Sequence, residues 1–197
     1  MIAPERFLVS SSDREKWLAL RAEGVTATAV AKAVTPLGLK EVLAELRRPR
    51  GIPDNDYMRF GRDQEGPIID KLASVIDITP NDWLISKDLE DNRWQMATPD
   101  GLSSDHSVIA EVKTTGKDWG SWAKVPGHYQ RQVQWQLHVT GADGCVFAWM
   151  LRATKNGEFV PAWPGPKYVE VERDESLISR LQEVAHELYA ELRAIRG

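Results

Sequence analysis

The stretch from Thr98 to Thr115 constrains this chain most, because it joins a tight turn to a strand-like segment and places charges on both. Residues 107–115 alternate between apolar and polar side chains, a pattern that is typical of a β-strand. Successive side chains of a strand point to opposite faces, so Glu111 and Lys113 are expected on one face. Val112 is then expected on the other face, where it can join the core.

The turn before this segment carries a second acid. Pro99-Asp100-Gly101 is typical of a chain reversal, so we expect Asp100 to return beside Glu111 across a hairpin. Two carboxylates and the Lys113 ammonium would then share one small site. Carboxylate oxygens suit Mg²⁺ or Mn²⁺, and a lysine beside them can position or activate water. The alternative is a surface salt-bridge ladder, in which Glu111 and Lys113 pair in solvent.

The composition is that of an ordinary globular protein. With 197 residues the chain can bury a substantial core, and residues 1–197 are expected to form a single domain. The net charge of −4 is not typical of a nucleic-acid binder, although a local basic lining around an acidic site can still hold DNA.

The single cysteine, Cys145, excludes an intramolecular disulfide and any multi-cysteine metal site. It lies in the apolar run 145–150, so a buried core position is expected rather than a nucleophile. No apolar run approaches the roughly 20 residues of a membrane span, and the N-terminus does not resemble a signal peptide. The sequence therefore predicts no membrane association and an intracellular, cytoplasmic location.

Hydrophobic periodicity and turn residues divide the chain into helices and strands. Helices are expected over 10–23, 25–34, 39–46, 54–75, 129–139 and 174–196. Strands are expected over 82–89, 93–98, 107–115, 145–152 and 167–172, the first three as a meander. Pro67 predicts a kink or a helix start, and Gly141 is expected to end a helix. This order predicts an α/β (α+β) fold with a central sheet and helices packed on it.

Two basic features lie in the N-terminal half. Arg21 ends the first expected helix, and Thr26 and Thr28 lie near the start of the second. A guanidinium followed by hydroxyls and backbone N–H groups can form a phosphate pocket, and ordinary helix capping is the alternative. The basic loop around 47–51 can follow a nucleic-acid backbone or simply end a helix in solvent.

Several short motifs occur in a fixed order from about Asp13 to Leu188. They are Trp17-x-x-x-Arg21 with Gly24-Val25-Thr26-Ala27-Thr28, Gly61-x-x-x-Glu65, Pro99-Asp100 with Glu111-x-Lys113, Tyr129-x-x-Gln132-Val133-Gln134 with Val139-Thr140, and Val171-Glu172-Arg173-Asp174-Glu175. In this combination the chain resembles a lambda-type phage exonuclease of the YqaJ-like recombinase group, within the PD-(D/E)xK nuclease superfamily. The resemblance implies a restriction-endonuclease-like core with a central mixed β-sheet flanked by helices.

The resemblance also implies roles for individual residues in catalysis. Asp100, Glu111, the backbone carbonyl of Val112 and Glu65 would bind two Mg²⁺ ions, with Mn²⁺ as a substitute. Lys113 would orient or deprotonate the attacking water, with a pKa lowered by the metals. Gln132 would help to hold that water.

A 5′-phosphate pocket follows from the same resemblance. It assigns the phosphate to Arg21 and to the hydroxyls of Thr28 and Thr98, where the family's type enzyme has serines. The segment 47–53 does not align clearly with the family, so no DNA-wedge residue is assigned there.

The implied function is a 5′→3′ exonuclease that degrades one strand of linear double-stranded DNA from 5′-phosphorylated ends. It would leave 3′ overhangs for phage-type recombination, act as a ring-shaped homotrimer, and work with a single-strand annealing protein. Two alternatives remain open. One is a structure- or site-directed endonuclease of the same superfamily, and the other is a non-catalytic DNA-binding subunit.

Overall fold

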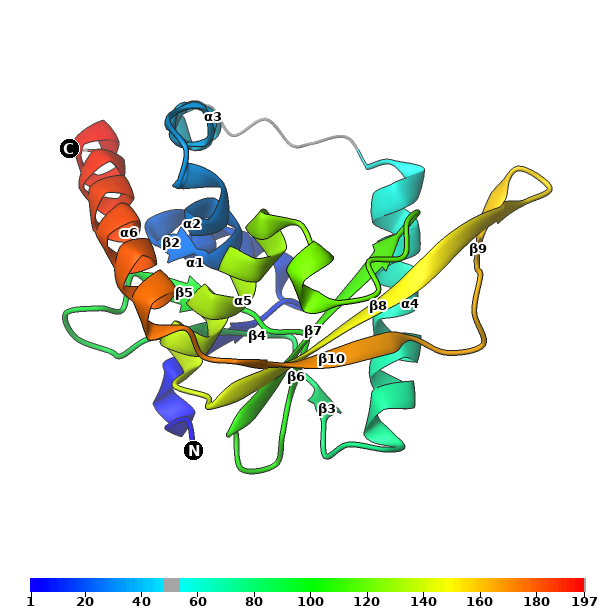
Figure 1. The fold of residues 1–197 in the computed structure, drawn as a ribbon. Helices are drawn as coiled ribbons and strands as arrows, with labels where there is room; N and C mark the ends of the chain where they lie inside the picture. The colour runs from blue at the N-terminus through cyan, green and yellow to red at the C-terminus, as the bar shows by residue number, and fades with distance from the viewer. Residues whose placement is uncertain (48–53, 197) are drawn as a thin grey trace.

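The computed structural model describes residues 1–47 and 54–196 (Figure 1). Its α-helices are α1 (Arg14–Glu23), α2 (Ala27–Ala33), α3 (Pro36–Arg47), α4 (Asp56–Ala73), α5 (Gly127–Thr140) and α6 (Glu175–Arg196). Its strands are β1 (Phe7–Ser10), β2 (Val25–Thr26), β3 (Thr79–Pro80), β4 (Trp83–Ser86), β5 (Gln95–Ala97), β6 (Gly101–Leu102), β7 (Val108–Thr115), β8 (Gly144–Lys155), β9 (Glu158–Pro161) and β10 (Lys167–Glu172). Two short 3₁₀ helices are η1 (Pro4–Arg6) and η2 (Trp122–Lys124).

The strands of this part of the chain form two mixed sheets with helices around them (Figure 1). The smaller sheet has the order β1-β4-β5-β2, in which β2 runs parallel to β5. The larger has the order β10-β8-β7-β6-β3, in which β7 runs parallel to β8, and β9 pairs with the far end of β8. The predicted mixed α/β architecture is therefore confirmed, with the central sheet divided in two.

The alternation of side chains along β7 and β8 directs them toward two different helices. One face of the larger sheet buries Val112 with Ile68 of α4. The other face buries Phe147 of β8 in a larger cluster with Val133 of α5. Because Glu111 precedes Val112 in the same strand, its side chain must point toward α5. The sheet thus has α4 on one face and α5 on the other, with Glu111 on the α5 face.

Most predicted elements are present, with shifted boundaries. Pro67 lies inside α4, and the helix continues through it. The strand expected over 145–152 extends to Lys155, and Asn156 and Gly157, both with positive φ, turn it into β9. Among the described residues, none of the helices combines the length and hydrophobicity that a membrane crossing requires.

The predicted three-stranded meander is wrong. The strands β4 and β5 pair with each other, but β7 belongs to the other sheet, because the two-residue strand β6 occupies its edge through Gly101 opposite Ala110. The chain reversal also lies later than expected, in residues 103–107. There Asp105 accepts hydrogen bonds from the hydroxyls of Ser103 and Ser107.

Three cations from distant segments of the chain hold the C-terminal end of α5. Arg6 donates to the carbonyl of Val139 at 2.5 Å, Lys87 to that of His138 at 2.8 Å, and Arg173 to that of Leu137 at 2.7 Å. Cations at a helix C-terminus satisfy the last carbonyls and offset the helix dipole. This anchoring fixes α5, which carries the glutamines of the site described below.

The buried imidazole of His138 makes the stability of this region depend on pH. Burial, with the charges of Lys87 and Arg173, lowers its pKa to about 4, while an unfolded histidine has a pKa near 6.5. The unfolded chain therefore binds the proton first as the pH falls, so stability is lost between pH 6.5 and about 4. The loss is up to about 3 kcal/mol.

We expect His138→Gln to flatten this part of the pH profile, measured by urea unfolding at pH 7.5, 6, 5 and 4.5. His186→Gln, on the exposed face of α6, is the control and should keep the wild-type profile. Parallel profiles for wild type and His138→Gln would contradict the assignment.

Candidate active site

The side chains of Glu111 and Lys113 form an ion pair inside the protein rather than on its surface. Only 1% of Glu111 is exposed, so the surface salt-bridge ladder is excluded. The Lys113 ammonium contacts the Glu111 oxygen Oε1. Gln132 Nε2 donates to the same oxygen at 2.6 Å, and Gln136 Nε2 donates to the other oxygen, Oε2, at 2.7 Å. The carboxylate of Glu111 is therefore fixed by its own strand and by two successive turns of α5.

Asp100 lies beside β7, as its position before the hairpin predicts. Its backbone N–H donates to the carbonyl of Ala110 at 2.9 Å, and its Oδ2 accepts from the N–H of Val112 at 2.7 Å. The N–H and C=O of one residue point to the same edge of a strand. The carbonyl of Val112 is therefore directed to the edge where Asp100 lies.

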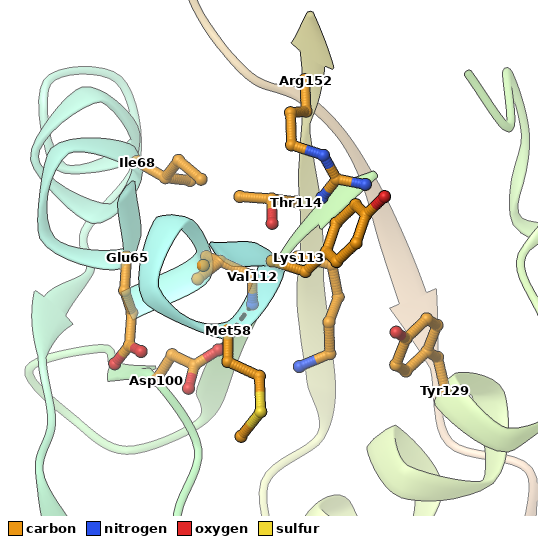
Figure 2. Close-up of a pocket in the computed structure, with 11 residues that line it drawn as sticks. Met58, Glu65, Ile68, Asp100, Val112, Lys113, Thr114, Tyr129 and Arg152 are labelled. Atoms are coloured by element: carbon orange, nitrogen blue, oxygen red, sulfur yellow. Dashed lines mark hydrogen bonds between the residues drawn. The ribbon is translucent and has the colours of Figure 1, made fainter. Parts of the chain in front are cut away.

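A cavity of about 410 Å³ brings these groups together with α4. Glu65, Asp100, Val112 and Lys113 line it, and the Lys113 ammonium lies 5.4 Å from the centre of the Tyr129 ring. Figure 2 shows the carboxylates of Glu65 and Asp100 side by side, with the ammonium of Lys113 reaching in from β7. Two carboxylates thus line this space, and the third, that of the buried Glu111, is bound to the Lys113 ammonium, which also lines it.

Burial and nearby charges raise the pKa of two of these acids, Asp100 and Glu65. Burial raises the pKa of Asp100 well above its usual range, and the nearby charges of Glu111 and Glu65 raise it further, against the opposing effect of Lys113. Burial also raises the pKa of Glu65. The charge of Lys113 lowers this pKa and the charge of Glu111 raises it. The carboxylates are therefore held together at an electrostatic cost.

Lys113 supplies positive charge to this cluster. Burial alone would lower its pKa, but the charges of Glu111 and Asp100 and the hydrogen bond to Glu111 outweigh burial and raise it. The lowered pKa of Lys113 beside bound metals stays a prediction. Without metals, Lys113 is a protonated donor.

The donor set fits hard divalent cations. Asp100, Glu65 and Glu111 offer carboxylate oxygens, Val112 offers a carbonyl, and positive charge would remove the cost of keeping the acids together. In residues 1–47 and 54–196, however, no three acidic, histidine or cysteine side chains converge into a ready-made metal site. Glu111 accounts for part of this, because Lys113 and the two glutamines already occupy its oxygens.

Gln136 is a site residue that sequence reasoning missed. Besides its bond to Glu111, its Nε2 lies 3.4 Å from the carbonyl of Thr98, and its Oε1 is buried without a hydrogen-bond partner among the described atoms. The signal was its position one helical turn after Gln132, on the same face. Gln136 connects the strand that carries Glu111 to the residue before Pro99.

Replacing Gln136 by leucine should destabilise the protein by about 1–3 kcal/mol, because Glu111 Oε2 loses its donor while staying buried. Chemical unfolding in chelator measures the effect. In a Glu111→Gln background, Gln136→Leu should lower the free energy of unfolding by clearly less, because no buried charge remains at position 111. Equal costs in both backgrounds would show that the contact does not stabilise the carboxylate.

The residues assigned to a 5′-phosphate come from neighbouring elements. Thr98 follows β5 and Thr28 lies in the first turn of α2, which directly follows β2, the parallel partner of β5. Thr28 is exposed, whereas Thr98 Oγ1 is buried without a hydrogen-bond partner in residues 1–47 and 54–196. Arg21 lies on the ring of Trp17, 4.1 Å from its centre, and pairs with no carboxylate in the described parts of the chain. Burial, with the charge of Arg14, lowers the pKa of Arg21 to about 10.

Two other sequence expectations concern Cys145 and the basic loop. Cys145 is buried, as expected, and burial with the charges of Glu111 and Asp100 raises the pKa of its thiol, which disfavours a reactive thiolate. Most of the segment 47–53, considered for nucleic-acid contact, lies outside the described residues.

The fold resembles that of solved nucleases. Two crystal structures of LHK-Exo, an alkaline exonuclease from Laribacter hongkongensis, one of them in complex with dAMP, are 26% identical to this chain over 92% of it and 94% of theirs. Their TM-scores are 0.71 for the dAMP complex and 0.69. A phage-related exonuclease from Haemophilus somnus 129PT shares the fold at 14% identity, with 88% of this chain and 96% of that one covered and a TM-score of 0.66. A search of curated proteins gave no significant match.

The family model that matches describes the YqaJ-like viral recombinase domain, and it spans residues 16–143. That range holds most of α1 and the whole of α4, β7 and α5, and with them each residue that the sequence assigns to the site. The chain belongs to the family of YqaJ-like viral recombinase domains.

Proposed function

We propose that this protein is a metal-dependent 5′→3′ exodeoxyribonuclease. It would degrade one strand of linear double-stranded DNA from 5′-phosphorylated ends and leave 3′ overhangs for recombination. The observation that carries the proposal is a cavity lined by Asp100, Glu65 and Lys113, with Glu111 paired to Lys113, in a member of a viral recombinase family. The exonuclease activity named for LHK-Exo agrees with it.

In this proposal Asp100, Glu111, Glu65 and the carbonyl of Val112 would hold two Mg²⁺ or Mn²⁺ ions. When bound, such ions withdraw charge from the scissile phosphate and make bound water more acidic. Asp100 is oriented for this role by the N–H of Val112. Glu111 is oriented by Gln132 and Gln136, and this positioning removes the need to order the ligands at each turnover.

Lys113 and Gln132 would handle the attacking water. The protonated ammonium of Lys113 can donate a hydrogen bond to water or to a phosphate oxygen. Gln132 already uses Nε2 for Glu111, so its amide oxygen is the group that can accept from water. Both residues would therefore orient the nucleophile.

The polarity of digestion would come from a separate phosphate pocket. Within the part of the chain that the structure describes, the Arg21 guanidinium has no carboxylate counter-charge and the buried Thr98 hydroxyl has no hydrogen-bond partner. The buried indole N–H of Trp17, under the guanidinium, is unpaired in the same part of the chain. Unpaired donors are costly unless a ligand satisfies them, and a terminal phosphate would satisfy all three, with Thr28 at the start of α2.

The proposed molecule is one domain over residues 1–197 that assembles as a homotrimeric ring and passes its product to an annealing protein. A ring suits the net charge of −4, because only the inner face must be basic to hold DNA.

Digestion of linear duplexes labelled at either the 5′ or the 3′ ends, with Mg²⁺ or with chelator, tests the activity. We expect Mg²⁺-dependent early release of the 5′ label, retention of the 3′ label, and slower digestion of 5′-hydroxyl ends. Nicking of closed circular DNA, together with equal digestion of duplexes that have 5′-phosphate or 5′-hydroxyl ends, would indicate an endonuclease. Binding without hydrolysis would indicate a non-catalytic subunit.

A further inference from the structure

The cavity has a second wall, which has no role in the chemistry above. Arg152, near the end of β8, borders the same cavity as Asp100 and Lys113, and Figure 2 shows it at the end away from the Glu65 and Asp100 carboxylates. Its guanidinium carbon lies 4.4 Å from the centre of the Tyr57 ring and 4.8 Å from that of Phe159. The two rings are 4.8 Å apart. The first turn of α4 and the strand β9 thus hold this side chain together.

This packing fixes Arg152 and leaves it free to donate. A guanidinium on aromatic rings uses its flat faces for the cation–π contact, and its N–H groups remain available at its edges. The rings also reduce the rotamer entropy that binding would otherwise cost. Arg152 is therefore preorganised toward an anion.

The charge of Arg152 is not neutralised within the described residues. Its neighbours on α4 differ in this respect, because Arg59 pairs with Asp56 at 2.6 Å and Arg62 with Asp54 at 2.5 Å. A cavity lined by the carboxylates of Glu65 and Asp100 repels a polyanion, so Arg152, unpaired within the described residues, is the group that a phosphate would meet first.

We propose that Arg152, held by Tyr57 and Phe159, binds a backbone phosphate of the substrate strand next to the scissile phosphate. The inference rests on the proposed function, since it takes the cavity as the place where a DNA strand is cut. Arg152 is a substrate-binding residue in this view, and the two rings position it. Its contribution is to affinity and register rather than to the chemical step.

Steady-state digestion of a 5′-phosphorylated duplex at several salt concentrations tests the proposal. Arg152→Ala should raise KM about tenfold, as for the loss of a charged hydrogen bond, with kcat changed by less than about twofold. The slope of log KM against log salt concentration should fall by the amount expected for the loss of about one phosphate contact. Phe159→Leu should raise KM with the salt dependence unchanged, because the charge remains. Arg59→Ala, which removes a cation already paired with Asp56, should change neither.

A neutral methylphosphonate placed at successive linkages of the strand gives a second readout. A methylphosphonate at one linkage next to the cleavage site should raise the KM of the wild type. At the same linkage it should leave the KM of Arg152→Ala unchanged. If that variant folds poorly, Arg152→Lys replaces it and should keep the salt dependence while losing part of the affinity. A well-folded Arg152→Ala with the wild-type KM and salt dependence would overturn the proposal.

Binding of a single-stranded oligonucleotide in chelator separates this proposal from the proposed function. If the wild type hydrolyses no DNA, the proposed function fails, and the binding assay still decides the role of Arg152. Binding about tenfold weaker for Arg152→Ala would support it, and equal binding would overturn it.

Discussion

Replacing Asp100 by asparagine is expected to abolish Mg²⁺-dependent DNA digestion and, in chelator, to make the protein more stable. Activity should fall at least about a thousandfold, equal to roughly 4 kcal/mol in the barrier, because asparagine is a neutral and much weaker metal ligand. The asparagine side-chain oxygen can still accept from the Val112 N–H, so the local fold is retained.

The gain in stability follows from the sign of the Asp100 pKa shift. Burial and the charges of Glu111 and Glu65 raise its folded-state pKa well above the ordinary 3.8. The folded state therefore binds the proton more tightly, and stability is lost as the pH rises above 3.8 toward the folded-state pKa. A neutral side chain removes this loss, so Asp100→Asn should be the more stable protein at pH 7.5 in chelator.

Thermal unfolding with and without Mg²⁺ measures both effects. The wild type should gain stability from Mg²⁺, and Asp100→Asn should not. Asp105→Asn is the matched control, since hydrogen bonds from Ser107 and Ser103 lower the pKa of Asp105 to about 2. That change should reduce stability and leave digestion unaffected. An Asp100→Asn protein that digests DNA normally, or that is less stable in chelator, would contradict the assignment.

Replacing Arg21 by methionine is expected to remove the preference for 5′-phosphorylated ends. Digestion from such ends should slow by about 100-fold, as for a charged, multiply hydrogen-bonded contact to phosphate, while 5′-hydroxyl ends should be affected little. The folded protein should be at least as stable as the wild type, because a half-buried guanidinium without a carboxylate partner costs desolvation and methionine keeps the contact with Trp17.

Competition between phosphorylated and unphosphorylated duplexes, with urea unfolding in parallel, measures this pair of effects. Arg14→Met, an exposed cation of the same helix that lies 5.8 Å from the Trp17 ring, is the control and should retain the preference. Equal loss on both kinds of end would mean that Arg21 acts on folding or general DNA binding rather than on the terminal phosphate.

The sequence predicted the local geometry of the site because strand periodicity determines it. Glu111 and Lys113 had to share a face and Val112 had to face the core, and both hold in the structure. The burial of Glu111 was not predictable in this way. It depends on Gln136, which is 25 residues away and is brought into contact by the packing of α5 on the sheet.

The errors in strand pairing have a similar origin. β6 and β2 have only two residues each, too short for any hydrophobic pattern, yet β6 takes the edge of β7 that was assigned to β5. Arg152 gave no signal either, since it ends an apolar strand and gains its surroundings only when β9 brings Phe159 back beside Tyr57.

The central claim is that Asp100, Glu111 and Glu65 hold the cations that cut DNA. Anomalous diffraction from crystals soaked in Mn²⁺ tests it most directly. We expect anomalous density beside Asp100 and the Val112 carbonyl in the wild type, and its loss in Asp100→Asn. Density that is absent from this cavity, or that lies elsewhere and survives the substitution, would contradict the claim.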